Sequence, residues 1–181
     1  QMGRLEVQGL ERIAFKLFSP GTNDASDQVD ASVETGEPFH VYKITDRKQV
    51  NQGLLVYTLH FASREFMRNI RTKVSQAYKG RPDSMVQQIL KDPEYLDTRK
   101  KLKYEKCANS DTIVVPNMRP FDAINMIASK SLPDKSDGVG YYFYETVKSF
   151  NFRSWESMVS NQGTNVRPVK QKFYYMPLKY K

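Results

Sequence analysis

The chain has 181 residues, of which 39% are hydrophobic and 12% aromatic, and its formal net charge is +8. A chain of this length can bury a hydrophobic core without metal or disulfide help, and the aromatic content argues against an intrinsically disordered polypeptide. The single cysteine, Cys107, excludes an internal disulfide, and no apolar run is long enough to predict a membrane span.

The charge is distributed unevenly along the chain. Residues 17–42 contain five acids and no Lys or Arg, whereas residues 64–81 contain six bases and one acid. Such separation favours either electrostatic steering between subunits or attraction of nucleic acid, and charge alone does not choose between them. The acids of the first block are Asp24, Asp27, Asp30, Glu34 and Glu37.

The N-terminal third predicts strands. Residues 12–19 alternate apolar and polar side chains up to a Pro-Gly turn, and residues 22–37 have no period, which predicts an exposed loop. Residues 37–45 and 54–62 predict an antiparallel hairpin joined by the polar connection 46–53. The second of these strands is apolar on both faces, which is typical of a barrel or sandwich wall that is covered on both sides.

The period changes from two to nearly four after Ser63. The spacing of Phe66, Ile70, Val74 and Ala77 predicts an amphipathic helix with Ser63 as its N-cap and this stripe in the core. Its basic face is then a polar surface open to a partner, with Arg64, Arg68, Arg71 and Lys73. Residues 83–91 predict a second helix, and the two helices together predict a helical hairpin inserted among the strands.

The C-terminal half predicts mixed structure. Short strands are expected at residues 100–105 and 111–115, followed by a helix that Pro120 opens with Phe121, Ile124, Ile127 and Ala128 on its apolar face. A hairpin at residues 141–152, a short helix capped by Ser154 and a strand at residues 172–175 complete the pattern.

These elements predict an α+β fold with two domains. Residues 1–107 are expected to form an antiparallel β-barrel domain with the inserted helical hairpin. Residues 108–181 are expected to form a mixed α/β segment that is incomplete.

No constellation of residues predicts catalysis. His40 and His60 lie in predicted strands and could meet across a hairpin to hold a metal, but a metal would need further ligands, and ordinary strand histidines are the competing interpretation. Cys107 has no second cysteine or base at a known spacing, and no phosphate-binding glycine loop or nucleophile elbow occurs. We therefore expect no catalytic, cofactor-binding or metal-binding residue, no cofactor and no enzymatic activity. A metal-dependent enzyme built on the two histidines is the weakest alternative.

An aromatic-rich stretch is the sharpest remaining signal. It admits three interpretations: a hairpin core, a subunit interface, or a stacking platform for single-stranded nucleic acid. Its members are Tyr141, Tyr142, Phe143, Tyr144, Phe150, Phe152 and Trp155, followed by Phe173, Tyr174 and Tyr175.

The order of several segments resembles a known family, the baseplate hub subunits of contractile-tailed bacteriophages, whose fold also recurs in type VI secretion spike proteins. The similarity covers about residues 10–158, and no single motif in it is diagnostic. The segments that carry it are VYKITDR at 41–47, residues 57–63, VSQAYKG at 74–80, VPNMRPFDAIN at 115–125, GYYFYET at 140–146 and FNFRS at 150–154.

The resemblance implies an N-terminal β-barrel, a mixed α/β segment and a homotrimer. In such hubs, repeated barrels give a pseudo-sixfold ring that joins the tail tube to the spike, so the implied partners are further copies of the chain, tail-tube proteins and spike proteins. The implied location is the virion tail, assembled in the host cytoplasm. Only one barrel is evident here, which departs from the family pattern. A basic nucleic-acid-binding module that uses the aromatic hairpin is the alternative from another class.

Overall fold

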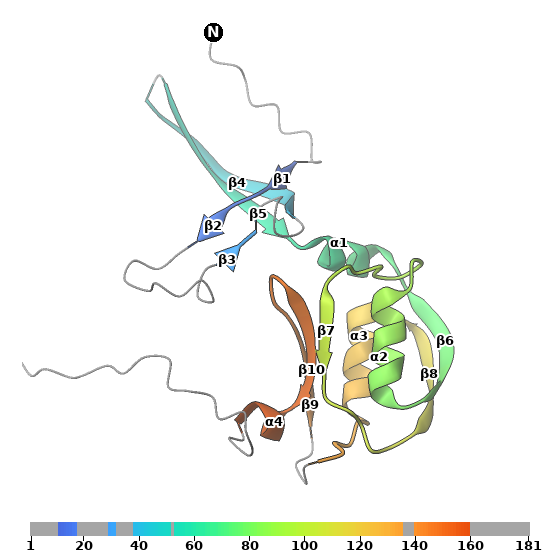
Figure 1. The fold of residues 1–181 in the computed structure, drawn as a ribbon. Helices are drawn as coiled ribbons and strands as arrows, with labels where there is room; N and C mark the ends of the chain where they lie inside the picture. The colour runs from blue at the N-terminus through green and yellow to red at the C-terminus, as the bar shows by residue number, and fades with distance from the viewer. Residues whose placement is uncertain (1–10, 18–28, 32–37, 52, 136–139, 160–181) are drawn as a thin grey trace, which may run out of the picture.

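The computed structural model describes residues 11–17, 29–31, 38–51, 53–135 and 140–159 (Figure 1). The described chain is an α+β fold with mostly strands and four helices, as the sequence predicts at this level. The predicted strand at residues 172–175 lies outside the described residues. None of the four helices is both long and apolar enough to cross a membrane.

The N-terminal part consists of two small antiparallel sheets. The first has the order β1-β4-β5, with β1 at Arg12–Ile13, β4 at Phe39–Asn51 and β5 at Leu54–Ala62. The second pairs β2, Lys16–Leu17, with β3, Val29–Asp30. The β4–β5 hairpin is the longest feature of this part and extends away from the rest of the described chain (Figure 1).

Three expectations for this part need correction. The strand predicted at residues 12–19 is divided into β1 and β2. The loop predicted at residues 22–37 contains β3 and the buried Ala31, whose backbone N–H donates to the Phe15 carbonyl over 2.9 Å. Pairing with distant strands therefore overrides the weak local pattern. The polar connection predicted at residues 46–53 is mostly strand, because β4 continues to Asn51 across register shifts.

The predicted barrel is not confirmed. Among the described residues, the sheets contain two or three strands each and none closes on itself. The covering predicted for both faces of residues 54–62 is wrong near the hairpin turn, where Leu54, Leu55 and Val56 are all exposed.

The helix predicted from Ser63 is shorter than the pattern suggests. Helix α1 spans Arg64–Arg71, and the chain then forms strand β6, Val74–Gly80, which pairs with β8, Asp111–Met118. A spacing of four residues places Val74 and Tyr78 on one face of a strand as well as of a helix, and pairing with β8 buries both. The predicted helical hairpin is therefore wrong, because β6 separates α1 from α2, Pro82–Lys91.

The orientation predicted for α1 is also wrong. Ser63 is its N-cap, as predicted, and accepts a hydrogen bond from the Phe66 N–H over 3.2 Å. However, Phe66 and Ile70 are 42% and 47% exposed, whereas the polar Glu65 and Asn69 are buried. Both buried polar groups have distant partners, since the Asn69 side chain accepts from the Phe121 N–H over 2.8 Å and Glu65 accepts from Thr98 over 2.5 Å. Polar pairing sets the face that this helix buries.

The described residues between Val74 and Phe152 share one hydrophobic core. Helices α2 and α3, Pro120–Ala128, lie between the β6-β8 sheet and a sheet of order β7-β10-β9 (Figure 1). In the latter, β10, Ser149–Ser154, runs parallel to β7, Lys101–Tyr104, and antiparallel to β9, Tyr141–Glu145. The apolar residues of α2, Met85, Val86, Ile89 and Leu90, are all buried, as are Ile124, Ile127 and Ala128 of α3. The domain boundary predicted at residue 107 falls inside this core.

A short helix follows the last strand, as the sequence predicts. Helix α4 spans Trp155–Val159, and the Ser154 hydroxyl accepts a hydrogen bond from the Ser157 N–H over 3.1 Å. The aromatic segment thus ends in a capped turn of helix.

Candidate functional site

The structure does not bring the two histidines together in the hairpin register. His40 is paired with Ala62, and His60 is paired with Lys43. The His60 Nε2 atom lies 2.9 Å from the Thr45 hydroxyl, which gives this ring nitrogen a hydrogen-bond partner within the sheet. Within the described residues, no group of three or more His, Cys, Asp or Glu side chains is arranged to hold a metal ion.

Cys107 lies in the core. Its side chain is 3% exposed, and burial raises the pKa of its thiol above the ordinary value. The backbone N–H of the same residue donates a hydrogen bond to the Asp83 carboxylate over 3.3 Å. A buried and protonated thiol is a poor nucleophile, so this position favours packing over chemistry.

The aromatic hairpin has one buried face and one exposed face. Tyr141, Phe150 and Phe152 belong to the core, with Phe143 packed against it, which confirms the core interpretation for alternate residues. Tyr142 and Tyr144 point to the other face and are 51% and 38% exposed. The interface and nucleic-acid interpretations therefore apply only to the outer face.

That outer face also carries positive charge. In the strand register, Tyr142 pairs with Arg153, while Tyr144 pairs with Asn151, which pairs in turn with Lys103. Trp155 extends the exposed aromatic surface, with its ring centroid 5.9 Å from that of Tyr142. The face combines stacking groups with cations.

The β5 strand is an open edge within the described chain. It is the last strand in the order β1-β4-β5, so its outer side has no described partner strand. Its sequence, LLVYTLHFA, contains no Lys, Arg, Asp, Glu or Pro. Soluble proteins usually protect a long edge with such residues, because unpaired backbone groups recruit other strands.

The neighbouring strand shows the protection that β5 lacks. The β4 strand contains Lys43, Asp46, Arg47 and Lys48, and a bulge-like register shift separates Thr45 from Lys48. Both devices disfavour pairing with a further strand. The described N-terminal sheet is therefore asymmetric, with one charged and irregular strand and one apolar strand available for pairing.

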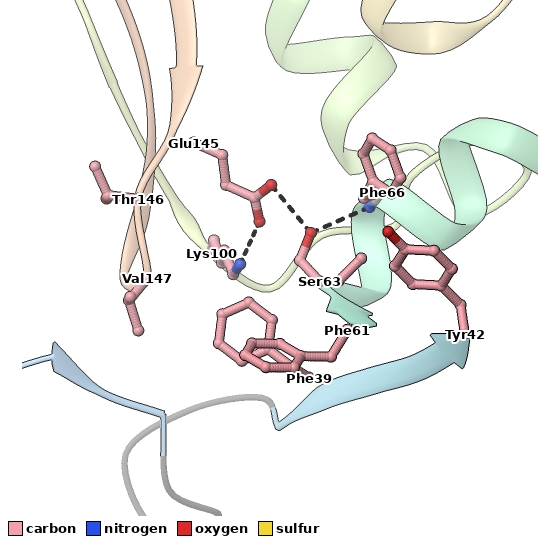
Figure 2. Close-up of a pocket in the computed structure, with 10 residues that line it drawn as sticks. Phe39, Tyr42, Phe61, Ser63, Phe66, Lys100, Glu145, Thr146 and Val147 are labelled. Atoms are coloured by element: carbon pink, nitrogen blue, oxygen red, sulfur yellow. Dashed lines mark hydrogen bonds and ion pairs between the residues drawn. The ribbon is translucent and has the colours of Figure 1, made fainter. Parts of the chain in front are cut away.

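An aromatic cleft lies between the base of the β4–β5 hairpin and the β9–β10 hairpin (Figure 2). Phe39, Phe61, Tyr42 and Phe66 line it from the side of β4, β5 and α1, and the turn between β9 and β10 lines the opposite side. Its volume is about 470 Å³. Phe39 and Phe61 contact edge to face, with ring centroids 5.3 Å apart. The cleft can accept an apolar group the size of a side chain.

A charged network joins the two sides of the cleft (Figure 2). The Lys100 ammonium donates to one Glu145 oxygen over 2.5 Å, and the Ser63 hydroxyl donates to the other over 3.0 Å. Lys100 also lies 3.5 Å from the fully buried Glu65 carboxylate. The cation offsets the cost of burying Glu65, so this network connects α1 to β9 and to the residue before β7.

This network is the part of the candidate site that sequence patterns miss. Glu65, Lys100 and Glu145 are far apart in the chain and have no mutual spacing that predicts a contact. The one local feature is the i, i+4 spacing of Glu65 and Asn69, which places both on one polar side of α1. This polar side is the side that the helix buries.

The basic face of α1 is largely used within the fold. Arg64 forms an ion pair with Asp97 at 2.8 Å, and Arg68 donates to the backbone carbonyls of Pro93 and Tyr95. These two arginines attach α1 to the turn after α2, so they are structural groups.

No protein-family model, curated protein or solved structure matches this chain.

Proposed function

We propose that this chain is a structural assembly subunit whose β5 strand pairs with a strand of a neighbouring copy. The observation that carries this proposal is the apolar edge strand Leu54–Ala62, which lacks the charges and prolines that normally prevent edge pairing. Leu54, Leu55 and Val56 are half-exposed near the hairpin turn and would gain burial on pairing. Main-chain hydrogen bonds supply affinity in such contacts, and the alternating side chains supply specificity.

At a finer level, we propose a hub of the contractile-tail type. The similarity to baseplate hub subunits supports this proposal, and its segments fall on β4, β5, β6, β8 with α3, and the β9–β10 hairpin. In this proposal the N-terminal sheet is part of a barrel wall that further strands complete, and three copies form a ring between tail tube and spike. In this proposal the subunit acts by binding its neighbours and not by catalysis.

Paired single substitutions test edge pairing. Val56→Lys places a charge on β5 at a position that is 49% exposed, and Val50→Lys makes the same change on β4 at a position that is 57% exposed. Light scattering on size-separated protein should give a trimer for the parent chain and for Val50→Lys, and a monomer for Val56→Lys. A trimer in all three proteins, or equal dissociation of both variants, would contradict pairing through β5.

Nucleic-acid binding is the second candidate, and one observation favours it. The outer face of the β7-β10-β9 sheet places the exposed Tyr142 and Tyr144 beside Arg153 and Lys103. Base stacking on such aromatics contributes about 1–3 kcal/mol per base. Fluorescence anisotropy with oligothymidylate tests it: salt-sensitive binding that Tyr144→Ala weakens, by a chain that stays monomeric, would replace assembly as the preferred function.

A further inference from the structure

A basic groove lies between helix α2 and strand β7. It belongs to the part of the chain that holds the hydrophobic core and lies away from the β5 edge. Gln87 and Lys91 line it from α2, and residues 98–102 with Tyr104 line it from the other side. Its volume is about 560 Å³. The lining includes Lys91, Arg99, Lys100 and Lys101 and no acidic residue, so the groove is complementary to an anionic ligand.

The cations of the groove differ in how far the fold uses them. Lys100 is paired with Glu145 and Glu65, so it contributes little net charge. Lys91 and Lys101 are exposed on opposite walls, and neither forms an ion pair with another side chain in the described part of the chain. These two lysines supply the charge that an incoming ligand would meet.

The groove also has an open strand edge. In the order β7-β10-β9, β7 is an edge strand, and its side away from β10 has no strand partner among the described residues. An edge of this kind presents alternating N–H and C=O groups, which match an extended polypeptide backbone. Nucleic acid would not use those groups, and Tyr104 is the one aromatic side chain in the lining.

We propose that this groove is a docking site for an extended acidic segment of a partner protein, which adds to the β7 edge and places carboxylates beside Lys91 and Lys101. The charge complementarity selects acidic side chains, and the strand edge selects an extended backbone. This surface is separate from β5, so it gives the subunit a second partner whose binding does not depend on edge pairing between copies.

The test uses a labelled twelve-residue peptide of alternating Glu and Thr, with a Gln-Thr peptide of equal length as its neutral counterpart. The Lys91→Glu/Lys101→Glu variant removes the proposed contacts. Lys79→Glu/Lys148→Glu reverses two exposed lysines outside the groove lining and gives the chain the same net charge. Equal melting temperatures in all three proteins establish that the fold is intact.

We expect the acidic peptide to bind the parent chain, the groove variant to lose about tenfold in affinity and the control variant to stay within about twofold. Amide exchange at Lys101–Tyr104 should slow when the peptide is bound, since its backbone would pair with β7. An equal loss of affinity in the two variants would show that the peptide responds only to net charge. Equal affinity of the parent chain for the Gln-Thr and Glu-Thr peptides would show that the lysines do not contribute to binding. Either of these two results would overturn the proposal. It would also be overturned if the acidic peptide did not bind, or if oligothymidylate displaced the labelled peptide at a lower concentration than unlabelled acidic peptide does.

Discussion

The Lys100 ammonium lies 2.5 Å from a Glu145 carboxylate oxygen, although 45 residues separate the two in sequence. The pair connects the segment before β7 with the end of β9, and the same cation faces the buried Glu65 at 3.5 Å. This network lies beside the aromatic cleft and holds α1 against the core region (Figure 2).

Removing the cation should destabilise the fold strongly. Lys100→Met leaves Glu65 buried with an uncompensated charge, which typically costs about 3–5 kcal/mol in the free energy of unfolding. Urea denaturation measures this loss. The double variant Glu65→Gln/Lys100→Met should be more stable than Lys100→Met alone, because it removes the buried charge, and a double variant of equal or lower stability would show that the pair is not coupled in this way.

Helix α1 should tolerate loss of an apolar side chain better than loss of a basic one. Ile70→Ala should cost less than about 0.5 kcal/mol because Ile70 is half-exposed. Arg68→Ala should cost about 1–3 kcal/mol, because it removes charged hydrogen bonds to the Pro93 and Tyr95 carbonyls. Chemical denaturation of the two variants gives the comparison. A larger loss in the free energy of unfolding for Ile70→Ala than for Arg68→Ala would show that Phe66 and Ile70 form the buried face of α1.

The two faces of the aromatic hairpin should respond differently to truncation. Phe152→Ala removes a fully buried ring and should cost about 3–5 kcal/mol. Tyr144→Ala removes a ring from the outer face and should cost less than about 1 kcal/mol. Thermal and urea unfolding of both variants gives the comparison, and a large loss for Tyr144→Ala would indicate that the outer face is covered within one copy.

Stability should fall at alkaline pH. Burial raises the pKa values of Cys107, Tyr78 and Tyr141, so the folded chain keeps protons that the unfolded chain releases. Their contribution is fully present below the unfolded pKa values and is lost as pH rises above them, from about 8.5 for the thiol and from about 10 for the two phenols, with a slope of about 1.4 kcal/mol per pH unit for each group.

Urea denaturation at a series of pH values measures the slope of the free energy of unfolding against pH. A range from about 8 to 11 spans the ordinary pKa values of a thiol and a phenol. Cys107→Ala should reduce it near the lower end of this range, where the unfolded thiol ionises first. A pH-independent stability across the range would contradict the buried environment assigned to these side chains.

Local patterns predict the helices and strands around the hydrophobic core well, with the exception of β6. The apolar spacing in α2 and α3, the proline start of α3 and the aromatic strands of the β9–β10 hairpin each match the structure. These signals are sufficient because each element buries the face that its own sequence marks as apolar.

The α1 region could not be predicted in the same way. Val74 and Tyr78 fit a helix and a strand equally, and pairing with β8 some 40 residues later decides for the strand. The buried face of α1 depends on Lys100, Thr98 and Phe121, which no local pattern includes. The same limit applies to the candidate site, whose residues converge only through tertiary contacts.

Hydrogen exchange of the β5 amides tests the proposed assembly most directly. If β5 pairs with a neighbouring copy, exchange within Leu54–Ala62 should slow by more than about tenfold between dilute and concentrated protein, while β4 changes less. Val56→Lys should abolish the difference. Exchange of β5 that is the same at every concentration, in protein that light scattering shows to associate, would contradict the claim that this chain assembles through its uncharged edge strand.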